Sequence, residues 1–221
     1  MTPESSDIPE LNPWLEAQLV RHGGAGRVLD LGCGRGYWME RMVAAGLDPV
    51  GLEHELPRAL DALRHAPAAV ADGAHLPVAD ASMSLVWCIH VLHHLHDPVQ
   101  VLAEIRRVLR PDGHLVLAET VEDHPVIAVG RRIHPEWDGV GVHSRFTAAE
   151  MVRLLGRAGF EVVDRRQHSL FSFAAWALPG ARRRTWVRAT RIEAHLPRWF
   201  DRWGAHLECV ARRAVDGGAG T

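Results

Sequence analysis

Residues 28–38 read VLDLGCGRGYW, an apolar run that ends in Asp30 and is followed by three glycines. A short apolar run of this kind predicts a buried strand. Gly32, Gly34 and Gly36 alternate directly after it, and residues without a Cβ atom permit a tight turn that a ligand can approach closely. Any ligand held there must suit the carboxylate of Asp30 at the strand end.

The rest of the chain alternates short apolar runs with amphipathic stretches. We expect strands at 27–31, 48–53, 68–73, 84–90, 114–120, 161–167 and 207–214, and helices at 10–22, 37–46, 56–66, 97–113 and 146–160. Strands that alternate with helices over short connections predict βαβ units. The predicted fold is therefore α/β: a doubly wound, mostly parallel seven-stranded sheet with helices on both faces.

Three parts are expected along the chain: an N-terminal arm and helix (1–22), a core (23–169), and a C-terminal helical cap with the last strand (170–221). Within the core, Thr147 and Glu150 have the spacing of a capping box, so a helix should begin there. The helix at 97–113 should stop at Pro111-Asp112-Gly113.

The composition restricts the classes of function. The 221 residues are 47% hydrophobic and carry a formal net charge of −2, which gives no electrostatic reason to bind nucleic acid. All 25 basic residues are arginines, so no lysine is present to form a Schiff base or to act as a base.

The cysteines, the N-terminus and the hydropathy together predict a cytoplasmic protein. Cys33, Cys88 and Cys209 form no CxxC pair, which fits free thiols in a reducing compartment. The polar segment MTPESSDIPE does not read as a signal peptide. No apolar run approaches the length of about 18 residues that a membrane span needs.

Two further carboxylates follow the next strands, Glu53 at the end of the second and Asp72 after the third. Ligands of open α/β sheets sit at the carboxyl ends of the strands, so these groups should face one site together with Asp30. Asp30 suits an ammonium group rather than a phosphate, Glu53 can accept from ribose hydroxyls, and Asp72 can accept from an adenine amino group. S-adenosylmethionine carries these three groups and no phosphate.

Simpler interpretations exist for the same residues. The glycines can form a strand-to-helix turn without a ligand, Glu53 can be a solvated strand end, and Asp72 can belong to an ordinary Asp-Gly turn. A nicotinamide-dependent dehydrogenase would also place glycines and an acidic residue here. Its GxGxxG pattern would need glycine where Tyr37 stands, and it would not carry Asp30.

Four phrases, in order along the chain, resemble the motifs of class I S-adenosylmethionine-dependent methyltransferases of the type 11 kind. They are DLGCGRG (30–36), ADGAHLPVADASMSLVWCIHVLHHLHDP (71–98), LRPDGHLVLAE (109–119) and HSRFTAAEMVRLLGRAGFEVV (143–163). The resemblance covers about residues 20–165. It departs from the family pattern at Ser84, where the family usually has aspartate in a structural role.

The resemblance implies S-adenosylmethionine as the cofactor and 23–169 as the core that binds it. It also implies the residues that line the cofactor: Asp30, Gly32, Cys33, Gly34, Glu53, His54, Asp72, Gly73, Ala74 and His90. The glycine turn with Asp30 would line the methionine part, and Glu53 would bind the ribose. Residues 72–74 would face the adenine, and His90 would close the pocket after the fourth strand.

By the same resemblance, the expected reaction is methyl transfer to a small-molecule acceptor, with O-methylation of a metabolite as the leading interpretation. A hydroxyl acceptor gains from a base, and histidine suits that role because its pKa lies near neutral pH. The first candidate is His143, followed by His90 and Glu119. His124 and His134 lie on or beside the same long connection (120–145), and each taken singly is interpreted as a surface residue.

Residues 90–96 read HVLHHLH and contain four histidines. His90, His93 and His94 would share one face of a helix, a spacing that permits metal binding. The family resemblance explains them, with His96, as residues of a helix start and a pocket rim. No metal site is therefore predicted.

Tryptophan and arginine are interleaved in residues 170–205, which include Trp176, Trp186, Trp199 and Trp203. We interpret this segment as a helical cap on the acceptor pocket. Because a basic aromatic segment can lie on anionic lipid, peripheral membrane contact with a lipid or quinone acceptor is the alternative. A non-catalytic S-adenosylmethionine-binding protein is a second alternative, and no nucleic acid partner is expected.

Overall fold

The chain folds around a mixed sheet, as seen in a computed structural model that describes residues 12–24, 26–125, 127, 143–170, 188, 192, 195 and 198–214. The strands are β1 (Arg27–Leu31), β2 (Asp48–Glu53), β3 (Ala68–Val70), β4 (Met83–Ile89), β5 (Leu109–Thr120), β6 (Phe160–His168) and β7 (His206–Arg213). The helices are α1 (Pro13–His22), α2 (Tyr37–Ala44), α3 (Leu56–Ala62), α4 (Pro98–Val108) and α6 (Ala148–Arg157), with short 3-10 helices η3 (Leu92–His94) and η4 (Arg198–Trp203).

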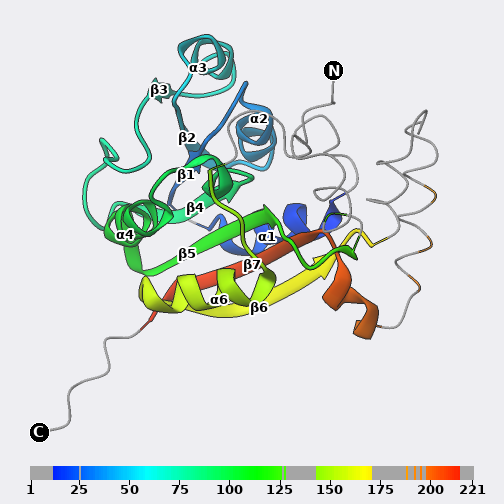
Figure 1. Cartoon of the computed structure of the whole chain (residues 1–221). Coiled ribbons are helices and arrows are strands. Elements are labelled where there is room, and N and C mark those ends of the chain that lie inside the picture. Colours follow the sequence, from blue (N-terminus) through cyan, green and yellow to red (C-terminus); the bar gives the residue numbers. More distant parts are fainter. Residues whose placement is uncertain are drawn as a thin grey trace, which may run out of the picture.

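The seven strands have the order β3-β2-β1-β4-β5-β7-β6 (Figure 1). Strands β1 to β5 run parallel to their neighbours in this group, whereas β7 runs antiparallel to both β5 and β6. The winding reverses between β1 and β4, so the crevice beyond their carboxyl ends is the expected ligand position. This architecture confirms the predicted doubly wound, mostly parallel α/β fold.

Helices cover both faces of the sheet because side chains of the central strands alternate between two apolar cores. Leu115 and Leu117 of β5 lie in a core with α4 and α6, while Val116 and Ala118 lie in a core with α1. Trp87 of β4 is fully buried in the second core. Figure 1 shows α4 and α6 on one side of the sheet and α1 on the other.

Side-chain caps fix the starts of two helices. Thr147 Oγ1 accepts from the backbone N–H of Glu150 at 3.2 Å, and the Glu150 carboxylate accepts from the backbone N–H of Thr147 at 2.8 Å. This pair confirms the predicted capping box at the start of α6. At the start of α4, Asp97 Oδ1 accepts from the backbone N–H groups of Val99 and Gln100.

The structure differs from the expectation at the end of α4. The helix ends at Val108 and β5 begins at Leu109, not at His114. Leu109 pairs with Met83, and the regular pairing of β4 with β5 resumes only at Leu85 and His114. Because Pro111 has no N–H to donate to the ladder, we attribute this register shift to a bulge at residues 110–113.

Ser84, at the position where the family pattern has aspartate, joins β4 to the start of β1. Its hydroxyl donates to the backbone carbonyl of Arg27 at 3.0 Å. A Cβ atom on Gly26 would lie 2.7 Å from Ser84 Cβ, so the backbone before β1 already packs against this side chain. The departure from the family pattern therefore retains a structural contact.

The last strand belongs to the core sheet, since β7 lies between β5 and β6. Glu208 of β7 is buried and accepts from His168 Nε2 at 2.9 Å, and also from Arg166 and Asn12. Burial opposes ionisation, but His168 and Arg166 together hold the pKa of Glu208 far below its usual value. The cluster ties the N-terminal end of the described chain to β6 and β7. Most of the expected cap at 170–205 lies outside the described residues.

We expect Thr147→Ala to lower the free energy of unfolding by about 1 kcal/mol, because the N–H of Glu150 loses its acceptor. Thr147→Ser keeps the oxygen and is the control, so it should stay within about 0.5 kcal/mol of the wild type. Urea unfolding followed by circular dichroism measures both values. Equal stability of the two variants would contradict this role of the cap.

Candidate functional site

The glycine turn after β1 adopts a backbone that favours glycine. The φ angles of Gly32, Gly34 and Gly36 are +71°, +55° and +88°, in the left-handed region that side chains with a Cβ atom rarely adopt. The backbone N–H groups of Gly32 and Cys33 both donate to the carbonyl of Leu52 on β2, at 2.7 and 3.1 Å. The turn is therefore held against the neighbouring strand end.

The three glycines face different surroundings. A Cβ atom on Gly32 would lie 2.4 Å from Val91 Cγ2, and one on Gly36 would lie 2.9 Å from Ala62 Cα. A Cβ atom on Gly34 would meet no atom within 4 Å. The sequence suggested that all three expose bare backbone to a ligand, but only Gly34 has this open space, while the other two permit close packing within the protein.

Asp30 is buried at the end of β1, with 2% of its surface exposed. Its Oδ2 atom has no hydrogen-bond partner among the described residues. Burial, with a smaller contribution from the neighbouring Glu53 carboxylate, raises the pKa of Asp30 to about 8. A buried carboxyl group without partners costs free energy, so this group marks a position where a cationic donor would be stabilising.

Glu53 at the end of β2 is also buried, but backbone donors surround it. Its Oε2 accepts from the N–H of Gly34 at 2.8 Å, and its Oε1 accepts from the N–H groups of His54 and Glu55 at 2.8 and 3.1 Å. A carboxylate offers about four acceptor positions, so about one remains, on Oε2. Glu53 is thus no solvated strand end, and it ties the glycine turn to the end of β2.

The other cofactor-binding residues expected from the sequence lie around this pair. The His54 side chain is exposed, with Nδ1 2.8 Å from Glu53 Oε1. The Cys33 side chain points away, into a small apolar cluster with Met39 and Ala62, where burial raises its thiol pKa. Only backbone atoms of Cys33 can therefore contribute to a site.

Asp72 lies in the turn after β3, where its Oδ1 accepts from the N–H of Ala74 at 2.9 Å. Its side chain is 71% exposed, and Gly73 and Ala74 are half-buried beside it. This is the hydrogen bond of an ordinary Asp-Gly turn, as the simpler interpretation expected. The second oxygen, Oδ2, accepts no hydrogen bond within the turn and lies 3.8 Å from His75 Nδ1, so the geometry is compatible with both interpretations.

At the ends of β4 and β5, Glu119 organises the segment that begins with His90. Glu119 Oε1 accepts from the N–H groups of Val91 and Leu92 at 3.0 and 2.7 Å, and Oε2 lies 2.5 Å from His93 Nδ1. Glu119, a candidate base from the sequence, is fully buried, so its carboxylate is not exposed to solvent. Its carboxylate faces backbone N–H groups and one imidazole instead.

From the sequence, we interpreted His93 as a residue of the pocket rim and did not name it as a candidate base. The strand order is the feature that would have identified His93, because the paired carboxyl ends of β4 and β5 bring the HVLHHLH segment over Glu119. The segment forms the short 3-10 helix η3 (Leu92–His94) and not a longer helix. His90 precedes it with a φ of +56°, which is strained for a residue with a Cβ atom.

His90, His93 and Glu119 bring one possible ligand atom each to within 4.8 Å of one another. The contact of 2.5 Å between His93 Nδ1 and Glu119 Oε2 is too short for two ligands of one ion. With metal–ligand distances of about 2.0–2.2 Å, the two atoms would subtend only about 70° at the ion, far below a tetrahedral angle. The distance is that of a hydrogen bond.

The loop histidines have different positions. His143 is exposed, its backbone N–H donates to the carbonyl of His93 at 2.8 Å, and its ring lies 3.8 Å from that of His96. It therefore stands on the rim beside η3. His124 is buried, with Nε2 2.7 Å from the carbonyl of Leu170, so its expected surface position is wrong. His134 lies outside the described residues.

The expected cap is described in part. In η4, Trp199 is 55% exposed and stacks on Phe200, and the Arg202 guanidinium lies 4.2 Å from the centre of the Trp203 ring. Trp176 and Trp186 lie outside the described residues. Within the part of the chain that the structure describes, no helix has both the length and the apolar character of a membrane span.

This site geometry agrees with sequence comparisons. Residues 29–117, from β1 to β5, match the family model described as "Methyltransferase domain". The chain therefore contains a methyltransferase domain, and its sheet has the fold of the class I S-adenosylmethionine-dependent methyltransferases. This similarity implies S-adenosylmethionine as the cofactor, and the unpartnered Asp30 oxygen at the strand end before the glycine turn fits its ammonium group.

Individual relatives of this methyltransferase are similar over parts of the chain. A Mycolicibacterium smegmatis protein named "probable S-adenosylmethionine-dependent methyltransferase" is 35% identical over 169 residues, which are 71% of this chain and 63% of that protein. The 27-O-demethylrifamycin SV methyltransferase of Amycolatopsis mediterranei is 37% identical over 42% of this chain and 38% of its own. The chain thus spans less than two thirds of the length of these curated relatives.

A solved S-adenosylmethionine-dependent methyltransferase from Mesorhizobium loti shares the fold. Its TM-score is 0.69 at 21% identity, with 95% of this chain and all of that chain covered. At this identity the likeness shows the fold alone. The shared fold includes the antiparallel strands β6 and β7 as well as residues 29–117, which match the family model.

The raised pKa of Asp30 makes the stability of this methyltransferase depend on pH. Folding takes up a proton between the usual value of 3.8 and about 8, so stability should fall as pH rises across this window. Between pH 6 and pH 8 the loss from this group is at most about 2 kcal/mol. Asp30→Asn cannot ionise and should lose less stability over this interval in urea unfolding. The same pH dependence in both proteins would contradict the assigned pKa.

Proposed function

We propose that this protein binds S-adenosylmethionine at the carboxyl ends of β1, β2 and β3 and transfers its methyl group to a hydroxyl of a small-molecule acceptor. The observation that carries the proposal is the buried Asp30 carboxyl, with an unpartnered oxygen beside a glycine turn that is open at Gly34. An ammonium group there favours the ionised carboxylate and offsets the effect of burial. A phosphate would add negative charge next to Asp30 and Glu53.

S-adenosylmethionine supplies a methyl group already activated by its positive sulfonium. The protein's contribution is to position the two reactants and to exclude water. Asp30 holds the ammonium, and the backbone of Gly32, Cys33 and Gly34 lines the methionine part. Glu53 has about one acceptor position left for a ribose hydroxyl, fewer than the two hydroxyls that the sequence suggested.

The remaining cofactor contacts follow the expected assignment. His54 covers the ribose from the exposed side, beside Glu53. Asp72 would accept from the adenine amino group through Oδ2, since Oδ1 already accepts from the N–H of Ala74, and the half-buried residues Gly73 and Ala74 would offer their backbone to the base. His90 closes the pocket at the end of β4, where burial lowers its pKa and keeps the imidazole neutral.

A hydroxyl acceptor releases a proton, and His93 is the best-supported base. Its Nδ1 lies 2.5 Å from the buried Glu119 carboxylate, which assigns the proton to Nδ1 and leaves Nε2 as the acceptor. A buried carboxylate that orients an imidazole in this way also stabilises its protonated form. Glu119 is then a positioning residue, and His143 and His90 are alternative bases at the rim.

Two observations bear on the nature of the acceptor. The Amycolatopsis relative is named for methylation at an oxygen of a rifamycin, which favours a hydroxyl acceptor here. Trp199, exposed between Arg198 and Arg202, favours the alternative of a lipid or quinone acceptor at a membrane surface. A screen for S-adenosylhomocysteine release should therefore include hydroxylated metabolites and quinols. Cofactor binding without release on either set would favour a non-catalytic S-adenosylmethionine-binding protein.

We expect isothermal titration calorimetry to show S-adenosylmethionine binding with a dissociation constant on the order of micromolar, and no binding of NADH. Glu53→Ala should weaken binding by about tenfold or more, because it removes a ribose contact and the anchor of the glycine turn. Glu55→Ala, next to it and exposed, is the matched control and should bind as the wild type does. Binding of NADH instead would overturn the assignment of the site.

For an acceptor found in the screen, we expect His93→Gln to lower kcat by about 10²–10⁴-fold, since the hydroxyl loses its base. The dissociation constant of S-adenosylmethionine should stay unchanged, and the acidic limb of the pH–rate profile should disappear. His94→Gln, on the same η3 segment, is the control. A kcat close to that of the wild type, with the acidic limb retained, would exclude His93 as the base.

A further inference from the structure

Three polar side chains on α4 lie in a row that faces the irregular segment after β3. Gln100, Glu104 and Arg107 are spaced four and three residues apart, so they share one face of the helix. The segment opposite them, residues 71–82, connects β3 to β4 and begins with Asp72, Gly73 and Ala74. We call the three α4 residues the α4 polar row.

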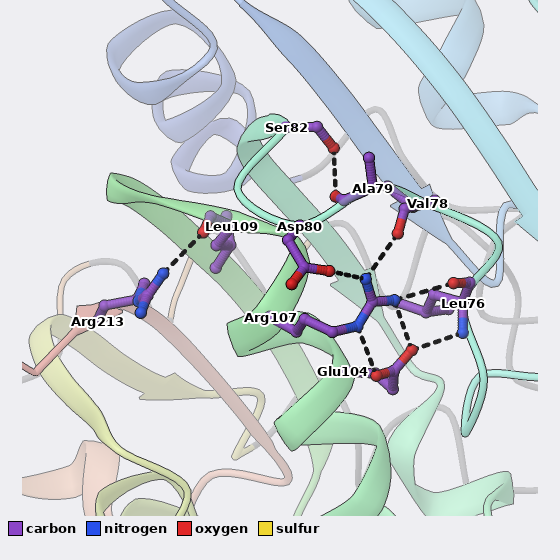
Figure 2. Close-up of polar contacts among 9 residues, drawn as sticks. All are labelled: Leu76, Val78, Ala79, Asp80, Ser82, Glu104, Arg107, Leu109 and Arg213. Atoms are coloured by element: carbon purple, nitrogen blue, oxygen red, sulfur yellow. Dashed lines mark hydrogen bonds and ion pairs between the residues drawn. The ribbon is translucent and has the colours of Figure 1, made fainter.

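Each member of the α4 polar row hydrogen-bonds the backbone of this segment. Gln100 Nε2 donates to the carbonyl of Ala74 at 3.3 Å, and Glu104 Oε2 accepts from the N–H of Leu76 at 2.8 Å. Arg107 donates to the carbonyls of Leu76 and Val78 at 2.9 and 2.8 Å. Figure 2 shows the Arg107 guanidinium surrounded by these acceptors.

Two carboxylates hold the Arg107 guanidinium in place. Both Glu104 oxygens accept from it at 2.7 Å, and Asp80 Oδ1 accepts at 2.6 Å (Figure 2). These hydrogen bonds lower the pKa of Glu104 and raise that of Arg107, so both groups stay charged. A planar guanidinium with five donors can satisfy two carbonyls and two carboxylates at once, which a lysine could not do.

The segment has no strand or helix to fix its path between residues 71 and 82. Its apolar anchor is Leu76, buried in the core beneath α4, and its polar anchors are the contacts of the α4 polar row. The row reaches Asp72 through two consecutive contacts. Gln100 holds Ala74 by its carbonyl, and the N–H of Ala74 donates to Asp72 Oδ1.

We infer that the α4 polar row sets the position of Asp72 and thereby the selectivity of the site for adenine over a 6-oxo purine. The inference rests on the proposed function, in which Asp72 accepts from the adenine amino group. A 6-oxo purine presents an oxygen at that position, and two acceptors facing each other cannot form a hydrogen bond. Gln100, Glu104 and Arg107 are then positioning residues, because they act only through the backbone that carries Asp72.

The test compares S-adenosylhomocysteine and S-inosylhomocysteine by isothermal titration calorimetry. These ligands differ only at one edge of the base, where the 6-amino group and unprotonated N1 of adenine are replaced by a 6-oxo group and N1–H. The wild type should bind the adenosyl ligand about 10- to 100-fold more tightly than the inosyl ligand. Gln100→Ala and Arg107→Met should each reduce this ratio by about threefold or more. The loss should fall on the adenosyl ligand, with the affinity for the inosyl ligand nearly unchanged.

Leu155→Ala is the control for a general loss of stability. Leu155 is a fully buried residue of α6 in the same core, and its apolar side chain forms no hydrogen bond with the segment after β3. It should lower the melting temperature and leave the ratio as in the wild type. If Arg107→Met does not fold, Gln100→Ala decides the question, because Gln100 is exposed.

The outcomes distinguish a failure of this inference from a failure of the proposed function. Binding of S-adenosylhomocysteine with an unchanged ratio in both variants, or without discrimination in the wild type, overturns the inference and leaves the proposed function standing. Absence of S-adenosylhomocysteine binding by the wild type overturns both. A reduced ratio in Gln100→Ala or Arg107→Met, with a normal ratio in Leu155→Ala, supports the positioning role.

Discussion

Burying a carboxylate costs free energy unless N–H groups or cations satisfy its oxygens. Three carboxyl groups are buried at the carboxyl edge of the parallel strands, and their hydrogen bonding differs. Glu53 accepts from three backbone N–H groups, and Glu119 accepts from two and lies against His93. Asp30 lies between them, at the end of the central strand β1, with an oxygen that has no partner among the described residues. The first two carboxylates fix the loops of this edge, and the third fixes none through its unpartnered oxygen, which is why the proposed function assigns it to a ligand.

The anchored carboxylates explain why irregular backbone at this edge keeps a defined shape. The glycine turn is held by the carbonyl of Leu52 and by Glu53, so its left-handed residues do not depend on local propensity alone. Glu119 does the same for Val91 and Leu92 at the start of η3, directly after the strained residue His90. Strain of this kind persists where surrounding contacts over-determine the backbone. No carboxylate at a strand end holds the segment after β3, and side chains of α4, including the Glu104 carboxylate, hold it from outside.

Much of the fold could be predicted from the sequence because it follows from local patterns. The strand 48–53 and the capping box at Thr147 agree with the structure, since period, caps and turn residues are local properties. The early start of β5 at Leu109 was missed because a bulge depends on pairing with β4. Contacts between distant residues were missed for the same reason: Glu119 with His93, and Glu208 with Arg166, are made only by the strand order. The sequence indicates which polar groups lie at strand ends, but it does not show which of them form hydrogen bonds within the protein.

The histidines of this edge add an electrostatic argument. Burial lowers the pKa of His90 and lowers that of His206 well below its usual value, so both imidazoles are neutral near pH 7. Their rings lie 5.5 Å apart, which places them on the same side of the strand ends of β4 and β7. Positive charge at that place would repel the cationic sulfonium of the cofactor. Neutral rings avoid this repulsion and still offer polar atoms to an acceptor. This histidine-rich edge is thus compatible with a cationic cofactor because His90 and His206 are uncharged. The imidazole best placed to take a proton is that of His93, whose Nδ1 lies 2.5 Å from the buried Glu119 carboxylate.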